Sequence, residues 1–169
     1  MARLYFLSNV NSDITAPGDF SKELLPNISG SLATVSSTVA GNSTELAYGV
    51  TEPLDPGVAG SVVGDYTFSF DCTGAAANMV VAFRVARINS AGTMQTESAL
   101  TSEISISTTG VKTATLTAID LGTFTSTDRL RVTYSLRNTA SGNKTISVDV
   151  NSVNSYVLTP FRAKFFVLS

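Results

Sequence analysis

The stretch DRLRVTYSLRN, residues 128–138, alternates strictly between polar and apolar side chains. Alternation over such a length has the period of a β-strand with one buried face, because successive side chains of a strand point to opposite sides. The set that should face the core comprises Leu130, Val132, Tyr134 and Leu136. The set that should face solvent comprises Arg129, Arg131, Thr133, Ser135 and Arg137.

The same period appears on both sides of this stretch. In residues 65–72 one face carries Tyr66, Phe68, Phe70 and Cys72, and in residues 144–151 one face carries Ile146, Val148 and Val150. Residues 111–119 alternate more weakly, while 79–88 are apolar on both faces near their start and predict a central strand. Residues 29–50 are rich in Ser and Thr and could hold one or two edge strands. The only helical candidate is a single turn over Asp19 to Leu24.

Short polar loops separate these strands. Residues 89–92 and 139–143 each contain Gly, so we expect two hairpins, 79–88 with 93–98 and 128–138 with 144–151. Further turns are predicted at Pro17-Gly18, Pro53–Gly57 and Asp120–Gly122. The apolar ends of the chain, Leu4–Leu7 and Phe161–Leu168, are expected to pair as two strands of one sheet.

Many short strands with frequent turns and almost no helix indicate an all-β protein. The predicted architecture is a single domain over residues 1–169, an antiparallel β-sandwich with jelly-roll topology. Residues 8–60 are predicted to form an extended, loop-rich N-terminal arm that packs on this domain or on a neighbouring subunit.

The composition excludes several classes of function. The 169 residues include no His, no Trp and one Cys, so histidine-based catalytic triads, histidine metal sites and internal disulfides are excluded. The net charge of -2 argues against nucleic-acid binding, and no apolar run is long enough to span a membrane. No signal peptide is recognisable at the N-terminus, so we expect synthesis in a reducing cytoplasm.

Carboxylates are the only plausible catalytic groups, and their spacing does not predict a catalytic pair. Asp65 and Asp71 share the outer face of one strand, while Glu52 and Asp55 lie in a Pro-rich loop. A calcium site built from these loop carboxylates and Asp120 would match no known calcium-loop spacing. Cys72 continues an apolar strand face and is expected to be an inert core thiol. We therefore predict a protein that is not an enzyme and that holds no cofactor or metal.

Charge is unevenly distributed along the chain. Residues 1–83 carry 2 basic and 8 acidic side chains, whereas residues 84–169 carry 9 basic and 5 acidic ones. An acidic half and a basic half could associate head to tail between subunits, or they could interleave within one subunit and cancel. The predicted interface residues are the strand arginines and the N-terminal apolar residues, namely Arg84, Arg87, Arg129, Arg131, Arg137, Leu4, Tyr5 and Phe6.

Several segments resemble small structural proteins of tailed bacteriophages and prophages. The opening ARLYFLSN (residues 2–9) is similar to the start of such proteins. Their jelly-roll module is resembled by YTFSF (66–70), RVARINSAG (84–92), TSTDRLRVTYSLRN (125–138) and LTPF (158–161). Within that group the resemblance implies a capsid decoration, or cement, protein of the virion. Such a protein would form a homo-oligomer, with a trimer favoured, and would contact the major capsid protein. Tail, baseplate and fibre proteins contain related modules.

A glycan-binding adhesive module is an alternative of a different class. It would need an exposed aromatic cluster, and the tyrosines considered for it are Tyr48, Tyr134 and Tyr156. About a quarter of the residues are Ser or Thr, and only 14% are charged. Such a surface forms hydrogen bonds without the desolvation cost of ions, which favours packing against other proteins.

Overall fold

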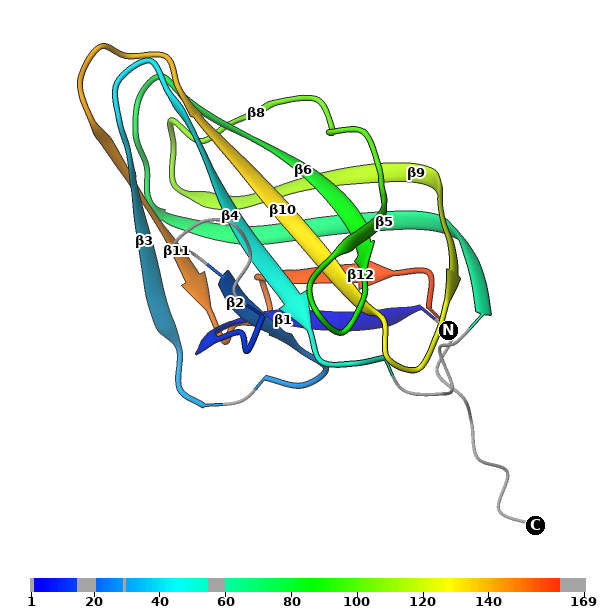
Figure 1. Ribbon diagram of the computed structural model, residues 1–169. Coiled ribbons are helices and arrows are strands. Elements are labelled where there is room, and N and C mark those ends of the chain that lie inside the picture. Colours follow the sequence, from blue (N-terminus) through cyan, green and yellow to red (C-terminus); the bar gives the residue numbers. More distant parts are fainter. Residues whose placement is uncertain (1, 15–20, 29, 55–59, 162–169) are drawn as a thin grey trace.

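The computed structural model describes residues 2–14, 21–28, 30–54 and 60–161, and in these ranges it contains strands but no helix (Figure 1). The predicted all-β class is confirmed. The strands are β1 (Arg3–Asn11), β2 (Ser21–Leu25), β3 (Ala33–Val39), β4 (Thr44–Thr51), β5 (Gly60–Gly74), β6 (Met79–Ile88), β7 (Met94–Glu97), β8 (Ile104–Ser105), β9 (Gly110–Phe124), β10 (Arg129–Asn138), β11 (Lys144–Val150) and β12 (Tyr156–Thr159).

The strands form one hydrogen-bonded network in the order β3-β11-β5-β12-β1-β2-β4-β10-β6-β7, with β9 on β5 and β8 on β6. Neighbours are antiparallel except β2 and β4, which are parallel. The sheet is therefore mixed, and the expectation of a purely antiparallel sheet was wrong at this pair. In the described ranges no helix is long and apolar enough to cross a membrane.

The core forms where side chains of β5 meet those of β6 and β10. Figure 1 shows β4, β10 and β6 crossing over β5 and β9 at a steep angle. The ring of Phe68 stacks on that of Phe83 with centroids 4.9 Å apart, and Tyr134 meets Phe83 edge-on. Aromatic contacts of this kind stabilise a core beyond the area they bury. The alternation of β5 and β10 thus predicted the core residues correctly, since Tyr66, Phe68, Leu130 and Val132 are fully buried.

The predicted hairpin between residues 128–138 and 144–151 was wrong. β10 pairs with β4 on one side and β6 on the other, so neither of its edges is free for β11. β11 instead lies between β3 and β5. The loop at 139–143 therefore connects distant strands rather than neighbours. The other predicted hairpin is confirmed, because β6 pairs with β7 around a turn in which Gly92 has a φ of +81°.

Two connections run side by side where the chain passes between these strands, namely 40–43 after β3 and 139–143 after β10. The Asn42 amide donates to the Ala140 carbonyl at 2.8 Å, and the Asn138 amide donates to the Ser43 carbonyl at 2.9 Å. A Cβ at Gly41 would lie only 2.0 Å from the Ser141 carbonyl oxygen, so this position requires glycine. The close approach of the two backbones fixes how β3 and β4 diverge.

The N-terminal third of the chain is part of the sheet and not an extended arm. β4 lies between β2 and β10, and β3 covers one edge of β11. The helical turn expected at Asp19–Leu24 was also wrong, because Ser21–Leu25 form strand β2. The sequence signal failed here because pairing with β4 overrides a weak local preference.

The N-terminal strand was placed correctly, whereas nearly all of its predicted partner lies outside the described residues. Leu4–Leu7 lie in β1, which pairs with β12 (Tyr156–Thr159) and with β2. The predicted C-terminal strand Phe161–Leu168 lies outside the described residues from Arg162 onward, as do Pro17, Gly18 and the 55–57 part of the Pro53–Gly57 turn.

Gly41→Ala should lower the free energy of unfolding by about 1–3 kcal/mol, because its methyl group would overlap the neighbouring backbone at Ser141. Gly142→Ala is the matched control in the adjacent loop, since nothing lies within 4 Å of a Cβ there. Urea denaturation of both variants measures the difference. Equal stability of the two variants would contradict the close crossing of the loops.

Candidate functional site

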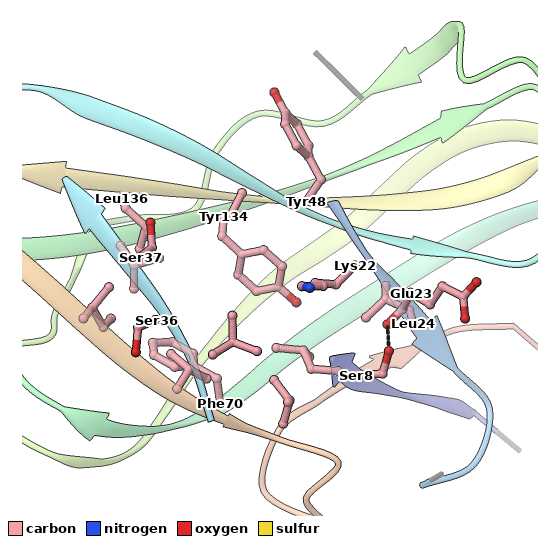
Figure 2. Close-up of a pocket in the computed structure, with 17 residues that line it drawn as sticks. Ser8, Lys22, Glu23, Leu24, Ser36, Ser37, Tyr48, Phe70, Tyr134 and Leu136 are labelled. Carbon is pink, nitrogen blue, oxygen red and sulfur yellow. Dashed lines mark hydrogen bonds between the residues drawn. The ribbon is translucent and has the colours of Figure 1, made fainter. Parts of the chain in front are cut away.

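A cavity of about 80 Å³ opens between β3 and β4 (Figure 2). β3 and β11 form one wall, β4 and β10 form the other, and β1 and β2 close one end. The inner surface is mostly aliphatic, with Leu24, Val35 and Leu136 among the lining residues. We call this feature the β3–β4 groove. Its size suits one small apolar side chain.

Two strand edges border this groove. Within the described ranges β3 pairs only with β11, so its other edge, residues 33–39, carries no strand. The first half of β4, residues 44–47, pairs only with β10, because β2 begins its pairing at Tyr48. β3 and β4 leave the tight loop at 40–43 and diverge (Figure 1). Backbone amides and carbonyls on such edges are a template for an added strand.

One buried hydroxyl lies in the groove without a partner. The Oη of Tyr134 is shielded from solvent and forms no hydrogen bond among the described residues. Burial raises the pKa of the Tyr134 phenol, so the group stays protonated and is available as a donor. Tyr48, on the neighbouring strand, points away from the groove (Figure 2) and lies against Arg131, whose guanidinium carbon is 5.2 Å from the ring centroid. Tyr48 and Tyr134 therefore do not form an exposed glycan-binding cluster.

Carboxylates bind three of the predicted interface arginines within the chain. Arg129 forms two hydrogen bonds to Asp13, at 2.7 and 2.9 Å. Glu97 binds Arg84 at 2.8 Å and Arg131 at 3.1 Å. Arg129 and Arg131 were expected to face solvent. They lie on the outer strand face as predicted, but both are buried.

Other parts of the chain cover this outer face. Ile14 packs on Val50, Ala86 and Ile88, and β7 brings Glu97 alongside the arginines. A sequence pattern reports which face a residue lies on, but not whether a distant segment covers it. That is why the alternation of residues 128–138 did not reveal the burial of Arg129.

Arg87 and Arg137 also have partners within the chain. Arg87 donates to the backbone carbonyls of Leu121 and Thr123 at 3.0 and 2.7 Å, on the outer edge of β9. Arg137 forms two hydrogen bonds with Glu103, and both side chains are about half exposed. Among the ion pairs of the described residues, only Arg129–Asp13 joins the acidic half to the basic half, because Glu97 and Glu103 belong to the basic half themselves. Both distributions considered for the charged halves therefore stay predictions.

The N-terminal residues predicted at an interface lie in β1, whose two edges are paired with β12 and β2. Tyr5 is buried, Phe6 is partly buried, and Leu4 is 39% exposed. β12 occupies one edge of β1 along these residues, and β2 occupies the other edge from Phe6 onward. The exposed side chain of Leu4 could also form a contact there. Whether these residues or the arginines contact a partner stays a prediction.

The carboxylates considered for catalysis or calcium binding are engaged at separate places. Asp65 accepts a hydrogen bond from the Ala118 amide, Asp71 from Asn154, and Asp120 from the Gly122 amide. Glu52 lies beyond the end of β4, and Asp55 lies outside the described residues. In the described parts of the chain, no three Cys, Asp or Glu side chains are grouped to hold a metal ion. The Cys72 thiol is buried, which raises its pKa.

Sequence reasoning did not find the β3–β4 groove. Its walls come from strands far apart in the chain, and its mouth depends on how the loop at 40–43 sits against the loop at 139–143. A detectable signal was the half-buried inner face of β3, where Val35 and Ser37 alternate with exposed Ser36 and Thr38.

Comparison with known proteins gives a likeness of fold only. No protein-family model and no curated protein sequence matches this chain. Two solved structures of a CocE/NonD family hydrolase from Staphylococcus aureus align with 96% of the chain at 8% identity, with TM-scores of 0.55 and 0.56. The chain spans 36% and 37% of those two hydrolase chains.

Asp13→Asn should destabilise the protein by about 1–3 kcal/mol near neutral pH, because it leaves the buried Arg129 charge without its carboxylate. The lower end of this energy range is expected, because the Asp13 side chain is 57% exposed and water screens its interaction with Arg129. Urea denaturation measures the loss. The matched control is Glu103→Gln, which breaks the exposed pair with Arg137 and should leave the unfolding midpoint unchanged.

The Asp13 pair should also make stability depend on pH. The hydrogen bonds from Arg129 hold the pKa of Asp13 below its ordinary value. The stabilisation is therefore fully present above the ordinary carboxyl pKa and is lost as the pH falls through the lowered one. The difference between wild type and Asp13→Asn should stay constant from neutral pH to about pH 5 and shrink below about pH 4. A difference that grows on acidification would refute the assignment.

Proposed function

We propose that this chain is a non-enzymatic structural protein that acts by packing against copies of itself and against other proteins. The observation that carries the proposal is the pair of free strand edges, on β3 and on the first half of β4, beside an apolar groove. Free edges and apolar grooves are features of proteins that bind other chains by strand addition.

Hydroxyl ladders on the outward strand faces support the same function. Between β3 and β11, Thr34 bonds Asp149, Ser36 bonds Ser147 and Thr38 bonds Thr145, at 2.7–2.9 Å. Thr67 and Thr115 form a further rung between β5 and β9 at 3.0 Å. The hydroxyl–hydroxyl rungs are polar but uncharged, so another protein can pack on them without desolvating ions, whereas Asp149 adds a charge to the β3–β11 face.

The virion is the proposed setting, and the chain is proposed to decorate and stabilise a bacteriophage capsid as a homo-oligomer bound to the major capsid protein. Support comes from the resemblance of residues 84–92 and 125–138 to phage structural proteins. In the structure residues 84–92 form the end of β6 and the turn before β7, and residues 125–138 include β10. β6 and β10 both contribute to the core. The chain would be made in the bacterial host and assembled onto the particle.

The proposed architecture is a jelly-roll sandwich. Its support is the pair of adjacent connections at 40–43 and 139–143, which carry the ribbon β3–β11 into the ribbon β4–β10. The stacking of Phe68 on Phe83 is the kind of contact expected between two facing sheets. A jelly roll joins its two sheets through paired crossings of this kind.

A hydrolase is the second candidate, because the solved structures with a similar fold are hydrolases. The sequence contains no His, so a serine or cysteine nucleophile would lack its usual base. The described carboxylates do not face one another across the groove, whose lining is mostly aliphatic. These features favour a structural function over hydrolysis.

The proposal predicts that the chain is present in heads of the phage particle whose genome encodes it. Heads assembled without its reading frame should release DNA at a lower temperature than complete heads, because they lack the added interfaces. Mass spectrometry of separated heads and tails, and dye access to DNA during heating, measure the two effects. Adding purified chain back to deficient heads is the control and should restore the temperature.

Four results would decide against capsid decoration. Absence of the chain from complete heads would contradict it. Release of DNA at the same temperature from complete and deficient heads would also contradict it. Recovery of the chain in the tail fraction would instead support the alternative of a tail, baseplate or fibre component. Retention of particles on a glycan array through this chain would support the adhesive module.

A further inference from the structure

The β3–β4 groove has the properties of a strand-acceptor site. An added strand can form backbone hydrogen bonds with the free edge of β3 and point every second side chain into the cavity. Val35 and Ser37 supply the inner face of β3, and Ala47 lines the facing wall. The occupant must therefore be an extended segment with apolar residues at alternate positions.

The chain carries such a segment at its C-terminus. Residues 162–169 read RAKFFVLS and lie outside the described part of the structure. On one face of a strand this sequence places Phe165 and Val167, and on the other Phe166 and Leu168. Either face would point two apolar side chains toward the open groove.

Charge favours the same occupant. Arg162 and Lys164 give the segment two positive charges. Glu45 lies on the half of β4 whose edge is free, where it can meet one of these cations. Lys22 lines the far end of the groove, so the basic residues of the segment are expected at the β4 end.

The position of the C-terminus argues for exchange between copies. The last described residue, Phe161, packs against Tyr5, Tyr66 and Phe124. Thr159 donates to the Arg3 carbonyl there, near the start of β1. In Figure 1 this end of β12 lies on the opposite side of the molecule from β3. An extended segment of eight residues spans at most about 29 Å, and a second copy can receive it without its passing around the sheet.

We propose that residues 162–169 of one copy add as a strand to the free edge of β3 in a second copy and place apolar side chains in its β3–β4 groove. The contact is heterologous, so repeated exchange gives closed rings or open chains according to the angle between copies. The inference deepens the proposed function, because it rests on self-association and names the segment and the acceptor.

The test uses two variants of the full chain, each of which removes one half of the contact. Ser37→Phe fills the acceptor groove from the inner face of β3 and leaves the C-terminal segment intact. The double variant Phe165→Asp with Val167→Asp removes the apolar segment and leaves the groove open. Thr38→Phe is the matched control, because it places the same side chain on the outward face of the same strand, outside the groove lining.

Light scattering after size exclusion measures the masses. Wild type and Thr38→Phe should form oligomers, whereas each half-contact variant alone should have the 17.7 kDa monomer mass. Mixing the two half-contact variants should give a species of twice that mass, because one supplies the segment and the other the groove. Urea denaturation of each variant checks that the monomers are folded.

A monomeric wild type would overturn the proposal, and so would oligomers of Ser37→Phe or a failure of the folded variants to combine. Insertion of the segment into its own groove would appear as a monomeric wild type. The result is separable from the proposed function. A monomer that still binds phage heads would refute strand exchange alone, and an exchanging oligomer absent from heads would refute decoration alone.

Discussion

The side-chain amide of Asn138 holds together the two connections on which the rest of the structure depends. This residue is buried at the end of β10, and its Nδ2 donates to the carbonyls of Val39 and Ala40 at 3.1 Å and of Gly142 at 2.9 Å. A buried carbonyl without a donor costs about 1–3 kcal/mol, so one amide satisfies groups that both loops would otherwise leave unpaired. The chain can therefore cross here twice, side by side, and still bury its backbone.

The groove follows from this crossing. Because the loops are tied together, β3 must follow β11 while β4 follows β10, and the two strands separate as they leave the loop. β2 enters from the far end and pairs with β4 only from Tyr48 onward. Leu24 of β2 packs against Gly49, where a Cβ would come within 2.9 Å of its side chain, so β2 cannot slide to fill the opening. The space left beside β3 is thus a consequence of topology and not of a missing core residue.

Local alternation predicted the strands and most of their inner faces, because the period of side chains along β5, β10 and β11 is a property of the strand itself. It failed for pairing. The hairpin expected across residues 139–143 rested on closeness in sequence, whereas the partners of β10 are chosen by the core that β4 and β6 share with it. It also failed for burial on the outer face, since Arg129 is covered by a segment more than a hundred residues away. The groove could not be predicted for both reasons, because its position depends on which strands pair and on which segments cover each strand face.

The placement of charge limits how this protein can bind others. Each arginine of β6 and β10 already has a carboxylate or carbonyl partner in its own chain, and breaking such contacts to form new ones across an interface would gain little. Outward faces carry paired hydroxyls, whose hydrogen bonds are also satisfied within the sheet. What stays open in the described structure is backbone, along β3 and the first half of β4 beside the groove, and along the outer edges of β7 and β9. Backbone edges bind any extended segment, so specificity for the β3–β4 groove must come from the side chains that enter it. A contact built this way does not depend on surface ion pairs and should tolerate changes in salt, unlike one built on opposing charged halves.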